Sequence, residues 1–301
     1  MSDDRLVWLN GGLIPWSKAT VPLLSHAVSR ASAIFEVFGI HKGPHGPMAF
    51  RMDEHLKRLS RSVDLLGMEM AWSEEEIAAG VSQTVKANHL GRGLIKIMAY
   101  WSEEAVMHLV LKSKLDVAIF AIPDSEELHL DDATPRSACL SRWRKLHPET
   151  AQVTAKACAN YLNAYLARKD AIDRGYDLGS LLGTDGFLAE GSTESVFLVK
   201  DGVLKTPPLG RILSSISRMS ILEVAPSVGI PVEETALRAD DLLRADEIFA
   251  SHSGIRVLPI SRFEGRNLEA PGPVTTKLVS LMDDILHFRS RQFEQFFQPL
   301  A

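Results

Sequence analysis

The first half of the chain contains short hydrophobic segments bounded by turn signals, a pattern that predicts β-strands. The segments "LVWLN" and "LIPW" flank Asn10-Gly11-Gly12, a turn signal that predicts a hairpin. "ASAIFEVFGI" predicts a strand, and "MAFR" predicts its return after the turn "KGPHGP". "LIKIMAYW" and "DVAIFAI" are apolar runs of strand length and predict two buried strands.

Two helices are predicted among these strands. The first has an apolar stripe at steps of three and four residues, formed by Leu56, Leu59, Val63 and Leu66. We expect Asp53 to cap its start and Gly67 to end it. The second, "SEEEIAAGVSQTVKAN", opens with the capping-box pair Ser73 and Glu76.

The second half alternates helical and strand patterns more strictly. The helix "ANYLNAYLARKDAIDRGY" is predicted to end at Gly175. Its predicted apolar face consists of Tyr161, Leu162, Tyr165, Leu166 and Ile172. Turns at Asp185-Gly186 and Asp201-Gly202 bound one expected strand that contains "LAEGSTESVFLVK". A helix follows from "SSISRMSIL", and Pro226 predicts its early end.

The remaining pattern completes an α/β arrangement. "PVEETAL" and "EIFASHSGIRVLPI" predict strands, and "ADDLLRAD" and "PVTTKLVSLMDDIL" predict helices. An acidic, proline-bounded segment, 123–135, separates the two halves of the chain, and we interpret it as an interdomain loop. We therefore expect a smaller N-terminal α/β domain, 1–122, and a larger C-terminal one, 136–301.

The composition narrows the class of protein. The 301 residues are 46% hydrophobic and 24% charged, and the net charge is −5 with both signs interspersed, so no nucleic-acid or membrane partner is indicated. Neither of the two cysteines lies in a CxxC pair, and the histidine spacings do not indicate a metal site. With no signal-peptide pattern at the start, we expect a cytoplasmic protein.

Lys156 is the residue whose setting asks for an explanation. In "ETAQVTAKACANYL" it is the one strong charge after Glu149. An ammonium in apolar surroundings is costly unless its pKa falls or the amine reacts, and only a neutral amine attacks a carbonyl carbon. The alternative is that Lys156 extends to water along its aliphatic stem.

Three distant features complement such an amine. Glu190, in an apolar strand, could pair with a protonated ring nitrogen, or could face water at the sheet surface. The "SSIS" segment, 214–217, opens a helix and could bind phosphate, or simply cap that helix. Arg58 lies off the apolar stripe and is expected to face sideways or outward, to a phosphate or to solvent. Together these features describe a pyridoxal 5'-phosphate (PLP) site.

From Val7 to Leu278 the chain resembles fold-type IV (class IV) PLP-dependent aminotransferases, and most closely the branched-chain amino acid aminotransferases. The resemblance lies in the segments "TAKACANYL", "AIDRGYD", "GFLAEGSTESVFLVKDGVLKTPP", "ILSSISR" and "ADEIFASHSG", and earlier in "NGG", "SHA", "IFEVF" and "FRMDEHLKRL". It implies two α/β domains with the cofactor in the cleft between them. It also implies a homodimer in which loops of one subunit complete the other's pocket.

The resemblance assigns roles to individual residues. Lys156 matches the catalytic lysine that forms the Schiff base with PLP, Tyr161 the tyrosine at the cofactor's 3'-oxygen, and Glu190 the carboxylate at the ring nitrogen. Leu213 matches the residue packed on the ring. The phosphate contacts match Arg58, Ile216, Ser217 and Ser253, and we count Glu194 and Ser195 with the cofactor-binding residues.

The implied reaction is a transamination in two half-reactions with ping-pong kinetics. Lys156 removes the substrate α-proton and returns it to the cofactor, and Glu190 keeps the ring nitrogen protonated. The expected donor is a branched-chain L-amino acid, and the expected acceptor is a 2-oxo acid such as 2-oxoglutarate.

The expected substrate-binding residues are Arg30, Phe35, Lys96, Ser253 and Gly254. Some residues of this expected substrate pocket differ from those usual in the family. Arg30 stands where branched-chain enzymes usually have tyrosine, and Leu94 and Lys96 stand where they have tyrosine and arginine. Arg30 could bind the α-carboxylate, or pair with a surface acid. D-amino acid and (R)-amine transamination are therefore alternatives. A 4-amino-4-deoxychorismate lyase and a non-catalytic PLP-binding protein are less favoured ones.

Overall fold

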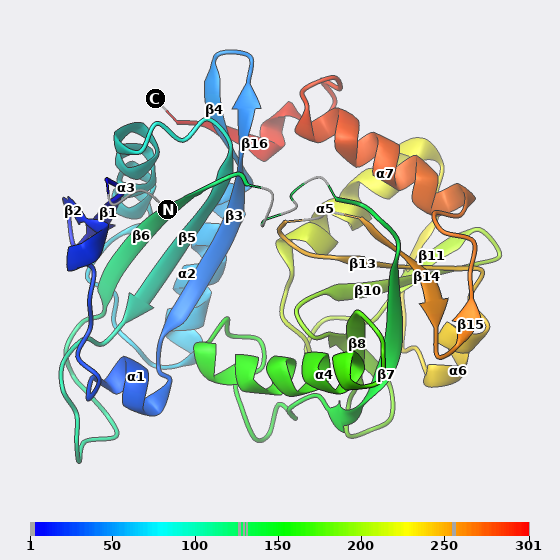
Figure 1. Ribbon diagram of the computed structural model, residues 1–301, viewed down its shortest axis with the longest axis horizontal. Coiled ribbons are helices and arrows are strands. Elements are labelled where there is room, and N and C mark those ends of the chain that lie inside the picture. Colours follow the sequence, from blue (N-terminus) through cyan, green and yellow to red (C-terminus); the bar gives the residue numbers. More distant parts are fainter. Residues whose placement is uncertain (1–3, 126–127, 129, 131, 255–256, 301) are drawn as a thin grey trace. The chain divides into compact units, whose positions relative to one another are not determined.

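The structure is a computed structural model that describes residues 4–125, 128, 130, 132–254 and 257–300. The chain forms two compact units, both mixtures of helices and strands (Figure 1). The first unit consists of Met1–Leu130, Ala155–Ala159 and Leu286–Ala301. The second unit consists of Asp131–Thr154 and Asn160–Ile285.

This division differs from the predicted domains 1–122 and 136–301. The segment Ala155–Ala159, which includes Lys156, joins the first unit, and so does the C-terminal segment from Leu286. As a result, the two units are nearly equal in length. Residues 126, 127, 129 and 131 of the predicted interdomain loop lie outside the described residues.

The first unit is built on a seven-stranded antiparallel sheet of order β16-β4-β3-β5-β6-β1-β2. Its strands are β1 (Leu6–Leu9), β2 (Gly12–Pro15), β3 (Ile34–Gly43), β4 (Gly46–Phe50), β5 (Gly93–Tyr100), β6 (Asp116–Pro123) and β16 (Phe297–Pro299). The predicted hairpin and the β3–β4 pairing are confirmed. The edge strand β16, which pairs with β4, has no counterpart in the prediction.

Helices α2 (Met52–Leu65) and α3 (Glu74–Ala87) pack on this sheet through a shared core, and α1 (His26–Arg30) lies outside it. Leu56, Leu59 and Val63 of the predicted α2 stripe are buried in that core, Leu66 follows the helix and is partly buried against it, and the capping box of α3 is present. The expected Asp53 cap is wrong. The α2 helix begins at Met52, two residues before the predicted start at Glu54, and its N-cap residue is Arg51. The backbone N–H of Met52 donates to Gln298 Oε1 at 2.8 Å, so the C-terminal segment satisfies a donor at the helix start.

The second unit is built on a nine-stranded mixed sheet of order β12-β11-β10-β13-β14-β7-β8-β9, with β15 beside β14. Its strands are β7 (Arg136–Arg144), β8 (Leu178–Leu182), β9 (Leu188–Gly191), β10 (Ser195–Lys200), β11 (Val203–Thr206), β12 (Val232–Glu234), β13 (Glu247–Ser251), β14 (Leu258–Phe263) and β15 (Arg266–Asn267). Its helices are α4 (Tyr161–Asp173), α5 (Ile216–Val224), α6 (Ala239–Leu243) and α7 (Pro273–Leu286).

Two predicted strands are each broken in two. The segment "LAEGSTESVFLVK" forms β9 and β10, separated at Ser192–Glu194, so Glu190 and Glu194 do not lie on one unbroken strand. "EIFASHSGIRVLPI" likewise forms β13 and β14. The early end of α5 is confirmed, because the helix stops at Val224 and Pro226 lies in a 3-10 turn.

The predicted apolar face of α4 is wrong. The residues that this helix buries are Ala164, Ala167, Asp170 and Ala171. Leu162, Tyr165 and Ile172 are exposed instead. The small residues face the sheet because β8 approaches the helix closely at Gly179, where a Cβ atom would lie 2.4 Å from the Ala167 carbonyl oxygen.

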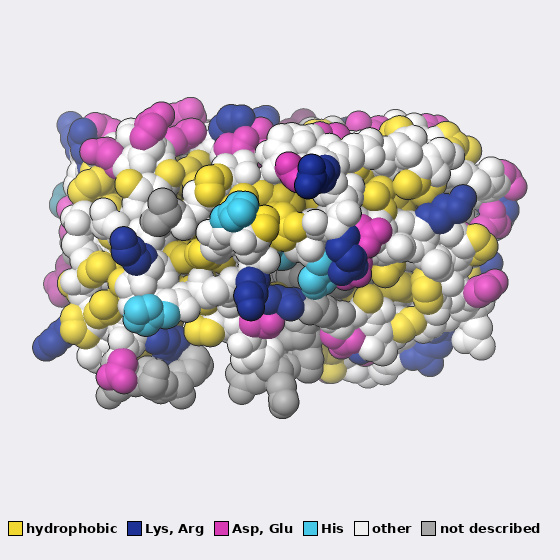
Figure 2. All heavy atoms as spheres, turned by 90° about the horizontal axis from the view of Figure 1, so that it is seen from above, with side chains coloured by type: hydrophobic (Ala, Val, Ile, Leu, Met, Phe, Trp, Pro, Cys, Tyr) yellow, Lys and Arg dark blue, Asp and Glu magenta, His cyan; other side chains and the backbone are white. Residues whose placement is uncertain are grey.

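Charged side chains of both signs lie among hydrophobic ones on the surface. Figure 2 shows Lys and Arg side chains interspersed with Asp and Glu on the face that it presents. This mixture agrees with the small net charge of −5. The hydrophobic side chains on the same face are a reminder that much of a folded protein's surface is apolar.

Candidate functional site

The backbone around Lys156 is fixed to strand β3 in the first unit. Phe35 N–H donates to the Lys156 carbonyl at 3.1 Å, and Cys158 N–H donates to the Ala33 carbonyl at 2.8 Å. Lys156 N–H donates to Ser62 Oγ at 3.0 Å, and that hydroxyl donates to the Arg58 carbonyl at 2.9 Å. The lysine segment is thereby tied to both β3 and α2.

The side chain of Lys156 lies over an aromatic ring that it shares with a second lysine. Lys156 Nζ is 4.7 Å from the ring centroid of Phe35, and Lys96 Nζ is 5.3 Å from the same centroid. Lys96 lies opposite Val37 in the β3–β5 pairing, diagonal to Phe35. The structure thus brings together three of the predicted site residues, with two amines beside one ring.

Arg58 is not outward-facing, as the sequence pattern had suggested. It is 7% exposed and holds the fully buried Glu36 of β3 through two hydrogen bonds, from Nε at 2.7 Å and from Nη2 at 2.6 Å. The guanidinium turns inward because a buried carboxylate needs a positive partner. Sequence reasoning missed Glu36, although a glutamate at a buried position of "IFEVF" was the available signal.

His55 completes this buried cluster. Its Nδ1 lies 2.7 Å from Glu36 Oε2. Burial lowers the pKa of His55 to about 4, although Glu36 opposes this shift. Burial alone would raise the pKa of Glu36, but Arg58 and His55 together lower it to about 2. At neutral pH the carboxylate only accepts hydrogen bonds, so Nδ1 of the neutral imidazole carries the hydrogen.

Arg30 ends the short helix α1 at an exposed position. Its Nη1 donates to the Ser29 carbonyl at 3.1 Å, and its Nη2 donates to the Val106 carbonyl at 3.1 Å. The guanidinium is therefore held against the segment around Val106. This geometry fixes where the arginine is, and its part in substrate binding stays a prediction.

In the second unit, Glu190 of β9 forms an ion pair with Lys145. Both side chains are largely buried, 15% and 9% exposed respectively. Glu190 therefore does not face bulk water, which was the alternative interpretation of its position. Sequence reasoning missed Lys145, because only the order of the strands reveals that it lies beside Glu190.

Glu194 and Ser195 lie next to this strand with different surroundings. Glu194, in the turn before β10, is buried and pairs with Arg168 of α4. Ser195 is the first residue of β10, lies opposite Ser251 of β13 and is buried. Because Glu194 already has a cationic partner, it stabilises the attachment of α4 to this turn.

The N-terminus of α5 carries the predicted phosphate-binding residues. Ser215 caps the helix by accepting from Arg218 N–H at 3.3 Å, and Ile216 and Ser217 are its first, buried residues. The first N–H groups of a helix have no partner within it, so they are suited to bind an anion. Leu213 precedes them and is half-buried.

The other predicted residues of this unit lie at element ends. Tyr161 is the first residue of α4 and is half-buried. Ser253 and Gly254 follow β13, and Gly254 N–H donates to His252 Nδ1 at 3.1 Å.

Comparison with known proteins identifies the family of the chain. The family described as "Amino-transferase class IV" matches residues 33–263. A branched-chain-amino-acid aminotransferase of Pseudomonas aeruginosa is 30% identical over 289 residues, which cover 94% of this chain and 93% of that protein. The chain is a class IV aminotransferase.

Solved structures of relatives have the same fold as this class IV aminotransferase. A branched-chain aminotransferase from Thermoproteus uzoniensis, solved with norvaline, has a TM-score of 0.93 and 31% identity, with 99% of both chains covered. A branched-chain amino acid aminotransferase from Thermobaculum terrenum, solved in its PLP form, has a TM-score of 0.93 and 28% identity, with 100% of both chains covered. The fold-type IV assignment is confirmed, and the protein is a PLP-dependent transaminase.

The side chains of this class IV aminotransferase fit the cofactor chemically. PLP requires an amine for its aldehyde carbon, an anion at its ring nitrogen, and N–H, hydroxyl or cationic donors for its phosphate. The first unit supplies the Lys156 amine beside Phe35. The second unit supplies the largely buried Glu190 and the start of α5.

Within the described ranges of this aminotransferase, no helix is long and apolar enough to cross a membrane. In the same part of the chain, no group of three or more His, Cys, Asp or Glu side chains is arranged to hold a metal ion. The cytoplasmic location stays a prediction.

Proposed function

We propose that this aminotransferase transfers the amino group of a branched-chain L-amino acid to a 2-oxo acid such as 2-oxoglutarate. One observation carries the proposal: Lys156, which matches the reactive lysine of the family, lies beside Phe35. The relatives that resemble this chain are named as branched-chain aminotransferases. The D-amino acid and (R)-amine alternatives, and the lyase and non-catalytic ones, are not favoured by these relatives.

Lys156 is the proposed catalytic base. Bound PLP supplies an aldehyde that condenses with amino groups and a ring that accepts an electron pair. Once substrate displaces its amine, Lys156 would take the proton from the substrate α-carbon and deliver it to the former aldehyde carbon of the cofactor, which is general acid–base catalysis. Its backbone hydrogen bonds to β3 and α2 restrict where that amine can reach.

The remaining cofactor-binding residues are proposed to bind and orient. Glu190 accepts a hydrogen bond from the protonated ring nitrogen, Tyr161 donates to the 3'-oxygen, and Leu213 packs on the ring. The proposed phosphate-binding groups are Arg58, Ile216, Ser217 and Ser253, with Glu194 and Ser195 supporting the neighbouring strand. Support comes from the start of α5 and from the fixed position of Arg58. We propose that these residues together bind one molecule of PLP.

The substrate wall is proposed to be cationic as well as apolar. Lys96 and Phe35 lie beside Lys156, so they are proposed to flank the substrate side chain together with Ser253 and Gly254. Arg30 is proposed to bind the α-carboxylate, because its guanidinium is always charged and matches a carboxylate in shape. The hydrogen bond from Arg30 Nη2 to the Val106 carbonyl holds its guanidinium against the loop that contains Val106.

We further propose a homodimer, supported by an exposed apolar surface on the first unit. We call this surface the loop patch: Leu23, Leu24, Val28, Val106, Met107, Leu109 and Val110 are all more than half exposed. Its two segments are joined, because Ala105 N–H donates to the Leu24 carbonyl at 3.1 Å and His26 Nε2 lies 3.0 Å from the Leu109 carbonyl oxygen. Contiguous exposed apolar side chains mark interaction surfaces.

A donor panel tests the proposed activity. The purified protein with PLP and 2-oxoglutarate should form glutamate fastest from L-leucine, L-isoleucine or L-valine, because those donors match the proposed pocket. The Lys156→Ala variant should lose turnover by several orders of magnitude, since no other amine replaces the base. Faster reaction with D-amino acids or (R)-1-phenylethylamine would refute the L-branched-chain assignment, and normal turnover by Lys156→Ala would refute the role of the lysine.

A further inference from the structure

The ion pair of Lys145 with Glu190 spans three strands of the second unit. Lys145 directly follows β7, and Glu190 lies in β9, with β8 between them. The lysine side chain therefore crosses one strand to reach the carboxylate. Both groups are largely withdrawn from water, so neither charge would be tolerated there without the other.

The backbone on both sides of the pair is fixed by hydrogen bonds. Lys145 N–H donates to the Leu182 carbonyl at 2.9 Å, which ties the residue to β8. Leu181 of β8 is the register partner of Glu190. The backbones of Lys145 and Glu190 are consequently fixed to consecutive residues of β8.

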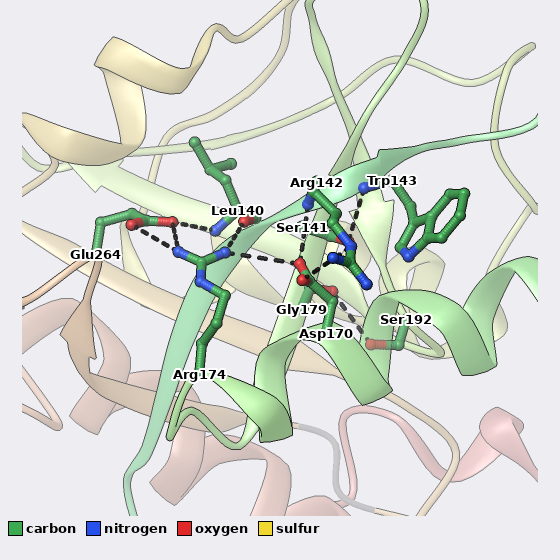
Figure 3. Close-up of polar contacts among 9 residues, drawn as sticks. All are labelled: Leu140, Ser141, Arg142, Trp143, Asp170, Arg174, Gly179, Ser192 and Glu264. Atoms are coloured by element: carbon green, nitrogen blue, oxygen red, sulfur yellow. Dashed lines mark hydrogen bonds and ion pairs between the residues drawn. The ribbon is translucent and has the colours of Figure 1, made fainter.

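A network of polar side chains holds β7 from its other side (Figure 3). Arg174, which follows α4, donates through Nη1 to the Leu140 carbonyl at 2.7 Å, and Leu140 N–H donates to Glu264 Oε1 at 2.7 Å. Asp170 of α4 accepts from Arg142 N–H at 2.9 Å. These hydrogen bonds fix β7, the strand that Lys145 directly follows, relative to α4.

We propose that Lys145 is a positioning residue for Glu190. Its ammonium holds one carboxylate oxygen, so that the second oxygen is oriented, as an anion, toward the ring nitrogen of PLP. The inference rests on the proposed function, in which Glu190 meets that nitrogen. A carboxylate has enough lone pairs to accept from both groups at once. Lysine suits this role because its ammonium is a compact point charge, whereas arginine tends to engage both oxygens of a carboxylate.

Lys145→Met is the informative substitution. Lys145 lines a cavity of about 300 Å³ together with residues such as Leu188 and Ala189. Methionine is an unbranched apolar side chain, so it fills similar space while it removes the charge. A matched control is Lys200→Met, which breaks the exposed pair with Asp246 in the same unit.

The test measures the affinity of the full-length protein, freed of cofactor, for two ligands. One is PLP, and the other is its benzene analogue, in which a C–H replaces the ring nitrogen. Lys145→Met should raise the Kd for PLP about tenfold, as expected when a charge-assisted hydrogen bond is weakened, and should leave the Kd for the analogue unchanged. Lys145→Arg should restore part of the loss, and Lys200→Met should change neither Kd.

Other outcomes overturn the inference. Equal weakening of both ligands would mean that Lys145 only supports the fold, and an unchanged Kd for PLP would mean that it has no positioning role. If Lys145→Met does not fold, Lys145→Met/Glu190→Gln replaces both charges. That variant should discriminate between the ligands no better than Glu190→Gln alone, and additive losses would contradict the coupling.

The experiment separates this inference from the proposed function. If the unaltered protein binds neither ligand, the proposed function fails. If Glu190→Gln binds PLP and the analogue as the unaltered protein does, Glu190 does not meet the ring nitrogen, and the inference fails with that assignment. If Glu190→Gln no longer binds PLP more tightly than the analogue, whereas Lys145→Met still does, only the role of Lys145 is refuted.

Discussion

At the scale of single residues, His55 couples the stability of the first unit to pH. Its pKa in the folded protein, about 4, lies below the ordinary value of 6.5, chiefly because of burial. Between these two values the unfolded chain binds a proton that the folded chain does not. The free energy of unfolding should therefore be highest above pH 6.5 and fall as the pH decreases toward 4, by up to about 3 kcal/mol.

Urea unfolding at pH 7.5, 6, 5 and 4.5 measures this dependence. His55→Gln removes the imidazole, so the slope of stability against pH over that window should become shallower than in the unaltered protein. His89→Gln is the control, because it removes an exposed histidine outside the cluster and should leave the slope in place. An identical slope in His55→Gln would contradict the assignment.

The reactive residues could be inferred from the sequence more readily than their partners. Lys156 stands out because it is the single cation in an apolar stretch, and Glu190 stands out in the same way. Their partners are set by folding. Lys145 comes 45 residues before Glu190, and Arg58 follows Glu36 by 22 residues. Residue patterns predict that a buried charge needs a partner, but only the strand order and the packing of α2 on β3 select which one.

At the scale of elements, α4 shows how close approach overrides hydrophobic periodicity. Alanine side chains of α4, such as Ala167, face β8, and Gly179 allows the two backbones to meet. Gly179→Ala would place a Cβ atom 2.4 Å from the Ala167 carbonyl oxygen, a backbone atom that cannot rotate away. We expect a loss of about 1–3 kcal/mol in the free energy of unfolding, as for other overpacked cores.

Chemical unfolding compares this variant with Gly91→Ala. A Cβ atom at Gly91 would meet nothing within 4 Å, so that substitution should change stability by less than about 0.5 kcal/mol. Equal stabilities of the two variants would show that α4 can shift away from β8 without cost.

Most other elements follow from local signals. The first hairpin, the capping box of α3 and the apolar runs of β3, β5 and β6 are read within a few residues, and these were predicted correctly. The sequence pattern did not predict α1, β7 or β8. The start of α2 and the strand β16 were not predicted either, because both depend on the chain end at Gln298, which lies 246 residues away from Met52. The breaks between β9 and β10 and between β13 and β14 also follow from tertiary pairing rather than from propensity.

At the scale of the whole molecule, the proposed homodimer connects the loop patch with Arg30. The Nη2 of Arg30 donates to the Val106 carbonyl, so the arginine lies at the edge of that patch. If the patch contacts a second copy, we expect Arg30 to reach the partner's site, because the family resemblance implies that loops of one subunit complete the other's pocket. The sequence indicated such an arrangement only by resemblance, because composition and periodicity do not reveal which exposed residues meet another chain.

Complementation between two impaired variants tests this arrangement. Lys156→Ala lacks the base, and Arg30→Ala should bind amino acids poorly while still reacting with amines that have no carboxylate. When the two are unfolded and refolded together, each mixed dimer contains one site with Lys156 from one chain and Arg30 from the other. Up to about a quarter of all sites in an equal mixture should then recover the Michaelis constant of the unaltered enzyme.

The same mixture distinguishes the competing arrangement. If Arg30 served the site of its own chain, no mixed dimer would contain an intact site, and the amino acid kinetics would stay those of Arg30→Ala alone.

Val110→Asp in both chains is the control for the dimer surface. A charge in the loop patch should prevent dimers, which sedimentation detects, and should abolish the recovery. Leu243→Asp places the same charge at an exposed position of α6 and should leave both the dimer and the recovery intact. If the Michaelis constant still recovers when both chains carry Val110→Asp, the copies meet through another surface. If dimers form without Val110→Asp but the Michaelis constant does not recover, Arg30 lies outside the partner's site.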